Sequence, residues 1–259
     1  HPKGFFPDLF YLTGEANNSY GYDMDITKFW PEFVTEFGGA AAFVDTAAKI
    51  RQAISIPVMT VGGVDPRLLP EYVEEAVSSS KIDFVALNRP LLADPDLPNK
   101  LIEGKIDEVR PCTHCYTCFK GGSGYCRVNA AYVRAGGEEM PEGYDVKPAT
   151  TIKKVMVIGG GPAGMEAARV AALRGHQVTL YEKSHRLGGL MPLASMVKGK
   201  HEKIMDFLSY LSTQIHELGV EVKLGQNVDS ALVEQVNPDA VIVATGGSYT
   251  SPDIPGITD

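Results

Sequence analysis

The stretch KKVMVIGGGPAGMEAARVAALRGHQVTLYEKSHRLGG, residues 153–189, decides the fold of the C-terminal part of this 259-residue chain. A short apolar run, VMVIG, leads into a glycine turn and an alanine-rich segment, and a second apolar run then ends in Glu182. The order strand, glycine turn, helix, strand is typical of the βαβ unit that binds dinucleotides. The stretch therefore predicts a parallel sheet with a Rossmann-like nucleotide site.

The glycine turn has the spacing G-x-G-x-x-G, with Gly159, Gly161 and Gly164 directly after the strand. The first glycine permits the tight turn, the second lets the backbone approach a pyrophosphate, and the third lets helix and strand pack closely. The phosphates then lie at the helix N-terminus. Glu182 closes the next strand about twenty residues on, where a carboxylate that binds ribose is expected. The alternative without a function is a glycine-rich turn beside an ordinary surface glutamate.

The first part of the chain, up to Arg110, alternates short apolar runs with helical stretches. Helices are expected in 42–55, with Asp45 as the N-cap, and in 66–80. Nearly continuous apolar strands are typical of a parallel sheet that is covered on both faces. The expected strands are DLFYLTG (8–14), IPVMTVGG (56–63) and IDFVALNRP (82–90). By itself this alternation fits either a Rossmann-like sheet or a (β/α)8 barrel.

Downstream of the glycine turn, a helix is expected in 202–218 and strands in 220–225 and 240–247. Between the two α/β parts, residues 134–150 are rich in Gly, Glu and Pro without periodicity, which predicts a linker.

All four cysteines lie in RPCTHCYTCFKGGSGYCRVN, residues 110–129, with the spacing C-x2-C-x2-C-x7-C. They are Cys112, Cys115, Cys118 and Cys126. Such sulfur ligation is typical of a [4Fe–4S] centre, and the bare amides of GGSG (121–124) are expected to donate to cluster sulfurs. His114 is expected to be a loop residue and not a ligand. Zinc bound by four cysteines is the main alternative, whereas disulfides are disfavoured without a secretory signal.

Composition excludes several classes of protein. The formal net charge of −8 leaves no basic block to neutralise phosphates, so a nucleic-acid partner is not expected. No apolar run reaches the roughly eighteen residues of a transmembrane helix. A cytoplasmic setting is the default without a signal peptide. The N-terminus, HPKGFFPDLFYL, lacks an initiator methionine, so we expect a segment of a longer protein.

The order of these features resembles the multi-domain branch of the old yellow enzyme family, which includes 2,4-dienoyl-CoA reductases, enoate reductases and trimethylamine dehydrogenase. The features are a parallel βα segment, the stretch from Ile82 to Cys112, the cysteine spacing and an FAD-like glycine fingerprint. The resemblance implies an α/β fold in three parts. They are the C-terminal portion of an FMN-binding TIM barrel with strands 6–8 (1–110), a [4Fe–4S] cluster loop with a linker (111–150), and the first part of a Rossmann-like FAD/NAD(P)-binding domain (151–259).

The resemblance also implies which residues hold the cofactors. The FMN phosphate is expected at residues that end the seventh and eighth barrel strands, namely Gly62, Gly63, Asn88 and Arg89. The second glycine pair in KSHRLGGL and the ATG stretch favour FAD over NAD as the resident dinucleotide. The residues expected at FAD are Gly159, Gly161, Pro162, Ala163, Gly164, Glu182, Lys183, Gly189, Leu190, Ala244, Thr245 and Gly246. The four cysteines are expected to ligate the cluster.

The implied activity passes electrons from NAD(P)H through FAD and the cluster to FMN, which reduces the C=C bond of an enoyl or enone substrate. The catalytic proton donor is expected upstream of His1. A second interpretation is an amine dehydrogenase, because C-x2-C-x2-C is closer to the trimethylamine dehydrogenase pattern. A third is a non-catalytic electron-transfer subunit, and a fourth is a zinc-binding module. A homo-oligomer, or another chain that completes the barrel, is the further partner expected.

Overall fold

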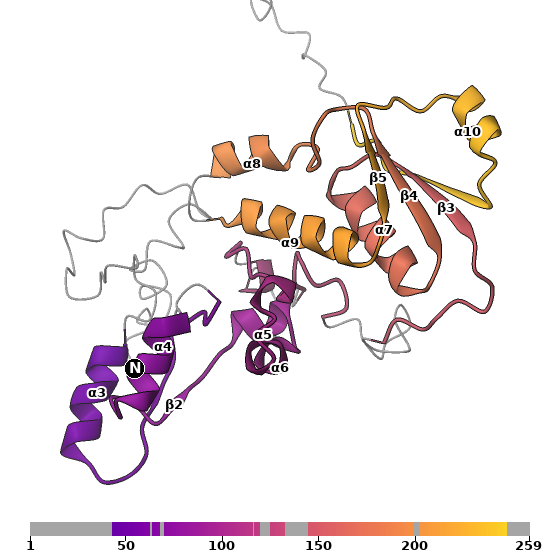
Figure 1. Ribbon diagram of the computed structural model, residues 1–259. Coiled ribbons are helices and arrows are strands. Elements are labelled where there is room, and N and C mark those ends of the chain that lie inside the picture. Colours follow the sequence, from indigo (N-terminus) through magenta and orange to yellow (C-terminus); the bar gives the residue numbers. More distant parts are fainter. Residues whose placement is uncertain are drawn as a thin grey trace, which may run out of the picture. The chain divides into compact units, whose positions relative to one another are not determined.

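A computed structural model of the chain describes residues 43–62, 64–67, 70–115, 117–119, 125–132, 145–198 and 202–247. The chain divides into two compact units, one formed by His1–Asp145 with Leu193–Tyr210 and the other by Val146–Pro192 with Leu211–Asp259. Both units contain helices and parallel strands (Figure 1). Residues 193–210 group with the first 145 residues, and the expected three-part organisation stays a prediction.

In the first unit, two short strands pair in parallel, with Met59 opposite Phe84 and Thr60 opposite Val85. Both lie inside predicted strands, whereas the predicted strand at 8–14 falls outside the described residues. The TIM barrel therefore stays a prediction. The helices and strands in chain order are α3 (Val44–Ala53), β1 (Met59–Thr60), α4 (Pro70–Ser78), β2 (Phe84–Val85), α5 (Arg89–Ala93), α6 (Leu97–Ile102), η3 (Ile106–Glu108) and η4 (Thr117–Phe119).

Helix α3 corrects one detail of the prediction. Phe43 and not Asp45 occupies the N-cap position, and no side chain caps the helix. Asp45 lies in the first turn instead, where a negative charge favours the exposed N–H groups of the helix end. The helix begins at Val44, one residue before the predicted N-cap, and buries Val44 and Ala47 on its inner face.

The core of this region forms between the two helices and the strand pair. Asp83 reinforces the core because its Oδ2 accepts a hydrogen bond of 2.7 Å from the backbone N–H of Val58 at the start of β1. Burial of small apolar side chains then holds the helices against the strands. The buried members are Val44, Ala47, Val58, Val64, Ala76 and Ile82.

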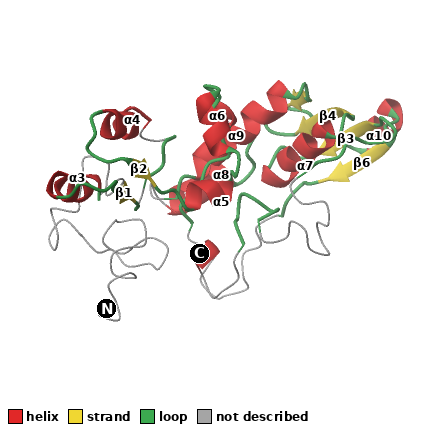
Figure 2. Ribbon diagram, turned by 90° about the horizontal axis from the view of Figure 1, so that it is seen from below, coloured by secondary structure: helices red, strands yellow, loops and turns green. Residues whose placement is uncertain are grey.

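The second unit is built on a four-stranded parallel sheet in the order β5-β4-β3-β6. Helix α7 packs against β3, β4 and β6 (Figure 2). The strands β3 and β4 are buried at Val157 and Leu180, and Ala168 on α7 is small enough for close packing. The helices and strands are β3 (Lys154–Ile158), α7 (Pro162–Leu173), β4 (Gln177–Glu182), α8 (Met191–Lys198), α9 (Ile204–Glu217), β5 (Glu221–Leu224), α10 (Ser230–Val236) and β6 (Ala240–Val243).

All four strands of this sheet were predicted, whereas α8 and α10 were not. Two consecutive parallel crossovers, β3 to β4 and β4 to β5, move in the same direction across the sheet, as in the dinucleotide-binding fold. Among the described residues, no helix is both long enough and apolar enough to cross a membrane.

Hydrogen bonds at both ends tie the cysteine segment to α5 and the turn that follows it. At the start, Asp94 Oδ2 accepts from the backbone N–H of Arg110 and from Lys100 Nζ, each at 2.7 Å. At the end, the Asn129 side-chain amide donates to the Leu92 carbonyl at 2.9 Å. The side chain of Asp94 is only 6% exposed, and Asn129 is fully buried. These two residues therefore fix where the cysteines lie relative to the end of β2.

We predict that Asp94→Ala lowers the free energy of unfolding by about 1–2 kcal/mol, since it leaves a partly buried ammonium group and a partly buried amide without their acceptor. Urea denaturation measures the loss, and hydrogen exchange at the Arg110 amide should accelerate. Asp107→Ala is the matched control, because Asp107 is exposed. Equal unfolding midpoints for the two variants would contradict this role of Asp94.

Candidate functional site

The first and third glycines of the fingerprint are required by packing. Gly159 has φ of +110°, donates its N–H to the Tyr181 carbonyl at 2.8 Å, and has no room for a Cβ because the Ala244 carbonyl oxygen lies there. A Cβ on Gly164 would collide with the carbonyl oxygen of Gly159. These glycines therefore bring β3, α7 and the end of β6 together, as predicted from the spacing.

The second glycine differs, because the space in front of it is open. A Cβ on Gly161 would have no protein atom nearer than the Gly189 Cα at 3.9 Å. Gly189 lies opposite with φ of +52°, and the N–H of Gly188 donates to the Gly160 carbonyl at 2.8 Å. Two stretches of bare backbone thus face each other at the N-terminus of α7. This cradle fits the close approach of a dinucleotide pyrophosphate.

Glu182 is fixed beside this cradle at the end of β4. It is 8% exposed, and its two carboxylate oxygens accept hydrogen bonds from the N–H groups of Gly160 at 2.6 Å and Ser184 at 2.8 Å. Burial raises the pKa of Glu182, but the Ser184 and Gly160 amides outweigh burial and hold it below the ordinary value. The carboxylate is therefore ionised and oriented, as an acceptor for ribose hydroxyl groups must be.

The other residues predicted at FAD gather around the same edge of the sheet. Pro162 and Ala163 are exposed in the first turn of α7, and Lys183 follows Glu182 on the surface. Leu190 is half exposed beyond the second glycine pair. Ala244, Thr245 and Gly246 follow β6. All lie at the carboxyl ends of parallel strands or at the helix that begins there, where ligands bind in such sheets.

The second unit also contains a cavity of about 430 Å³, which lies away from the cradle. It is lined by Lys154, Gln177 and Glu221 at the amino ends of three strands, together with His176. None of the predicted site residues lines it. We therefore place the candidate nucleotide site at the cradle and not in this cavity, because the backbone donors and Glu182 converge at the opposite edge of the sheet.

The residues predicted for FMN follow the two parallel strands of the first unit. Gly62, with φ of +115°, lies two residues after β1, while Asn88 and Arg89 follow β2. Because parallel neighbours end at the same edge of a sheet, these residues share that edge. Gly63 lies outside the described residues.

The four cysteines are free thiols in a partly buried setting. The backbone N–H of His114 donates to Cys112, that of Thr117 to Cys115, and those of Val128 and Asn129 to Cys126. The Thr117 hydroxyl adds a hydrogen bond of 3.2 Å to Cys115 Sγ. Three sulfurs thus receive an amide from the residue two positions on. His114 makes this possible at Cys112 by adopting a left-handed φ of +54°.

These amides are site features that sequence reasoning missed. The prediction assigned the donors to GGSG (121–124), which lies outside the described residues. The donors observed are residues with side chains. At Cys112, Cys115 and Cys126 a donor lies two positions after the cysteine. His114 takes part through its backbone.

Burial and mutual repulsion disfavour thiolates in this segment. Burial raises the pKa of Cys112 to about 12, against the Arg89 charge and the His114 amide, and it also raises the pKa values of Cys118 and Cys126. Burial would raise the pKa of Cys115 too, but hydrogen bonds from Thr117 lower it overall. Neighbouring cysteines contribute to these shifts, so the thiols lie within electrostatic reach of one another. Metal binding here must therefore release protons.

The donor set fits an iron–sulfur centre. Four free thiols lie in one segment, and three of them receive backbone amides, as thiolate ligands of such centres do. Within the described part of the chain, no three His, Cys, Asp or Glu side chains are placed to hold a single metal ion.

Comparison with known proteins identifies relatives for most of the chain. Residues 153–259 match the family described as pyridine nucleotide-disulphide oxidoreductase. An NADH oxidase of Thermoanaerobacter brockii is 41% identical over 216 residues, which are 81% of this chain and 32% of the relative. A cinnamate reductase of Clostridium sporogenes is 39% identical over 212 residues, which are 80% of this chain and 30% of the relative.

A solved structure also matches most of this chain. The complex of 2-naphthoyl-CoA reductase with 2-naphthoyl-CoA matches with a TM-score of 0.74 at 32% identity, over 85% of this chain and 33% of the other. The chain therefore spans about a third of the length of the proteins that it matches.

We predict that Gly161→Ala leaves the fold intact but weakens FAD binding, and that Gly161→Val abolishes it. An added Cβ meets no protein atom within 3.9 Å, and the backbone of Gly161 is extended, so only a ligand in the cradle opposes the side chain. The FAD content of the purified variants and their thermal unfolding are the measurements. Wild-type FAD content in Gly161→Val would exclude the cradle as the pyrophosphate site.

Proposed function

Because the chain belongs to the multi-domain old yellow enzyme family of flavin-dependent oxidoreductases, we propose that it forms part of an NAD(P)H-dependent ene-reductase. In this proposal two electrons leave NAD(P)H as a hydride and reach the C=C bond of an α,β-unsaturated carbonyl compound. The β-carbon gains the hydride equivalent and the α-carbon gains a proton. FAD supplies hydride acceptance, the [4Fe–4S] cluster supplies single-electron transfer, and FMN supplies hydride donation.

The residues of this chain have distinct tasks in the proposal. Gly161 and Gly189 admit the FAD pyrophosphate, while the ionised Glu182 orients the adenosine ribose. The four cysteines ligate the cluster, and the amides of His114, Thr117 and Val128 stabilise its sulfurs. Gly62, Asn88 and Arg89 hold the FMN phosphate, for which a guanidinium is suited by its two parallel N–H groups.

The observation that carries the proposal is the proximity of Arg89 to the cysteines. Arg89 opens α5 directly after β2, and its charge acts on both Cys112 and Cys118. The residue proposed for the FMN phosphate therefore lies within electrostatic range of two proposed cluster ligands. Such proximity is what single-electron transfer between FMN and a cluster requires.

Anaerobic titration of the full-length protein with NADH and NADPH tests the reductase. We expect one of the two nucleotides to bleach the flavin absorption, and an α,β-unsaturated carbonyl compound to restore it. The amine dehydrogenase is the second candidate, favoured by the C-x2-C-x2-C spacing. Bleaching by a secondary or tertiary amine, with no response to either nucleotide, would contradict the reductase and support the dehydrogenase.

We predict that Cys118→Ser loses the cluster while FAD stays bound, because the FAD cradle uses none of the cysteines. Iron and flavin content per chain, together with the broad absorption near 400 nm, are the measurements. Asp107→Ala, a substitution at an exposed residue of the same unit, is the control and should keep both iron and FAD. Full iron content in Cys118→Ser, or zinc in place of iron in the wild type, would refute the ligand assignment.

A further inference from the structure

Three arginines accompany the four cysteines. Arg110 lies two residues before Cys112, Arg127 directly follows Cys126, and Arg89 begins α5, near which both ends of the cysteine segment are hydrogen-bonded. Arg89 acts on Cys112 and Cys118. Arg127 acts on Cys115, and Arg110 acts on Cys126. No single sequence motif brings these arginines together, because Arg89 begins α5 while the other two lie just outside the first and last cysteines.

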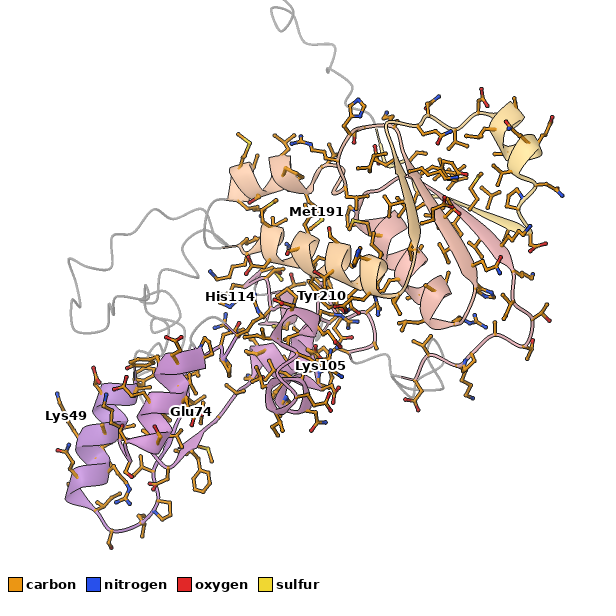
Figure 3. All side chains as sticks on the ribbon, in the orientation of Figure 1. Lys49, Glu74, Lys105, His114, Met191 and Tyr210 are labelled. Atoms are coloured by element: carbon orange, nitrogen blue, oxygen red, sulfur yellow. The ribbon has the colours of Figure 1, made fainter. Side chains whose placement is uncertain are left out.

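Two of the arginines are held by residues that come from far along the chain. Arg127 Nη1 lies 2.9 Å from Glu202 Oε2, and the Glu202 side chain is only 3% exposed. The Arg110 guanidinium lies over the ring of Tyr210, 5.7 Å from its centroid. Figure 3 labels Tyr210 on α9 and His114 on the cysteine segment.

The backbone of the same stretch, residues 202–210, is also bound to the cysteine segment and its unit. The N–H of Lys203 donates to the Thr113 carbonyl at 3.1 Å, between Cys112 and Cys115. Asp206 Oδ2 accepts from Arg67 Nη2 at 3.1 Å. The stretch 202–210 therefore has a fixed position against the cysteines, and so do the two arginines that it holds.

We propose that Arg89, Arg110 and Arg127 form a cationic set that raises the reduction potential of the cluster, and that Glu202 limits this effect by pairing with Arg127. The inference rests on the proposed function, since it requires a cluster on the four cysteines. Reduction adds one electron and makes the cluster more negative by one charge. Fixed positive charges favour that state. The Arg127 side chain is 46% exposed, so solvent screens part of its charge, whereas its partner Glu202 is buried.

The proposal predicts shifts of opposite sign for two partners of one ion pair. Arg127→Gln removes a positive charge, so the potential should fall. Glu202→Gln removes the negative charge that offsets Arg127, so the potential should rise. A purely structural role for the pair predicts no such opposition, because either substitution breaks the same contact.

Redox titration of the full-length holoprotein, followed by electron paramagnetic resonance, tests the proposal. For Arg127→Gln we expect about a tenfold lower ratio of reduced to oxidised cluster at fixed potential, which corresponds to about 59 mV for one electron. Glu202→Gln should shift the ratio in the opposite direction, and Arg127→Lys should stay near the wild type. Arg51→Gln is the matched control, because Arg51 pairs with Asp83 at 2.7 Å and acts on none of the cysteines.

Potentials that are unchanged, or that move in the same direction in both variants while iron content is normal, would overturn the proposal. If Arg127→Gln loses iron, the Glu202→Gln and Arg110→Gln variants decide, and they must shift the potential upward and downward respectively. A wild-type protein without a four-iron cluster would refute the proposed function itself. Measurement of iron therefore separates the two failures.

Discussion

The carboxylate of Asp94 is the interaction on which the arrangement of the first unit depends. It accepts from the Arg110 amide and from Lys100 while almost entirely buried, and so fixes the point at which the chain turns from the helices after β2 into the cysteine segment. Asn129 fixes the other end through the Leu92 carbonyl. With both ends held near α5, the cysteines stay close to Arg89, which begins that helix.

The environment of the thiols follows from this constraint. Holding four cysteines in a partly buried segment raises the cost of ionising them, as the pKa of about 12 for Cys112 shows. The amides and arginines around them offset part of that cost, and a bound metal centre would offset the rest by displacing the protons. The cysteines of this segment are therefore expected to ionise to thiolates only when they ligate a metal centre. The second unit has a different kind of site. Its cradle consists of open backbone beside one ionised carboxylate, and the nucleotide binding proposed there requires no metal.

The sequence predicted the second unit more completely than the first. The run from Lys154 to Glu182 specifies its strands, glycine turn and helix locally, so periodicity and glycine spacing were sufficient. The prediction that Asp45 caps α3 was wrong. Burial of Val44 outweighed the preference of aspartate for the N-cap position. Helices α8 and α10 were missed because they are short, with eight and seven residues.

The contacts of residues 202–210 with the cysteine segment could not be predicted from the sequence. The pairing of Arg127 with Glu202 joins residues 75 positions apart, and neither lies in a recognisable motif. The amides of His114, Thr117 and Val128 were missed for a related reason, since glycine is not required where a residue such as His114 adopts the left-handed backbone. Long-range charge pairing and local backbone strain both arise only once the chain has folded.

The central claim is that these four cysteines hold an iron–sulfur cluster next to the FMN edge of the first unit. X-ray anomalous scattering from crystals of the full-length protein, recorded at the iron and zinc absorption edges, tests it most directly. The account predicts a strong iron signal bounded by the sulfurs of Cys112, Cys115, Cys118 and Cys126, on the side of α5 where Arg89 begins the helix. A signal at the zinc edge alone, or iron bound away from these sulfurs, would contradict it.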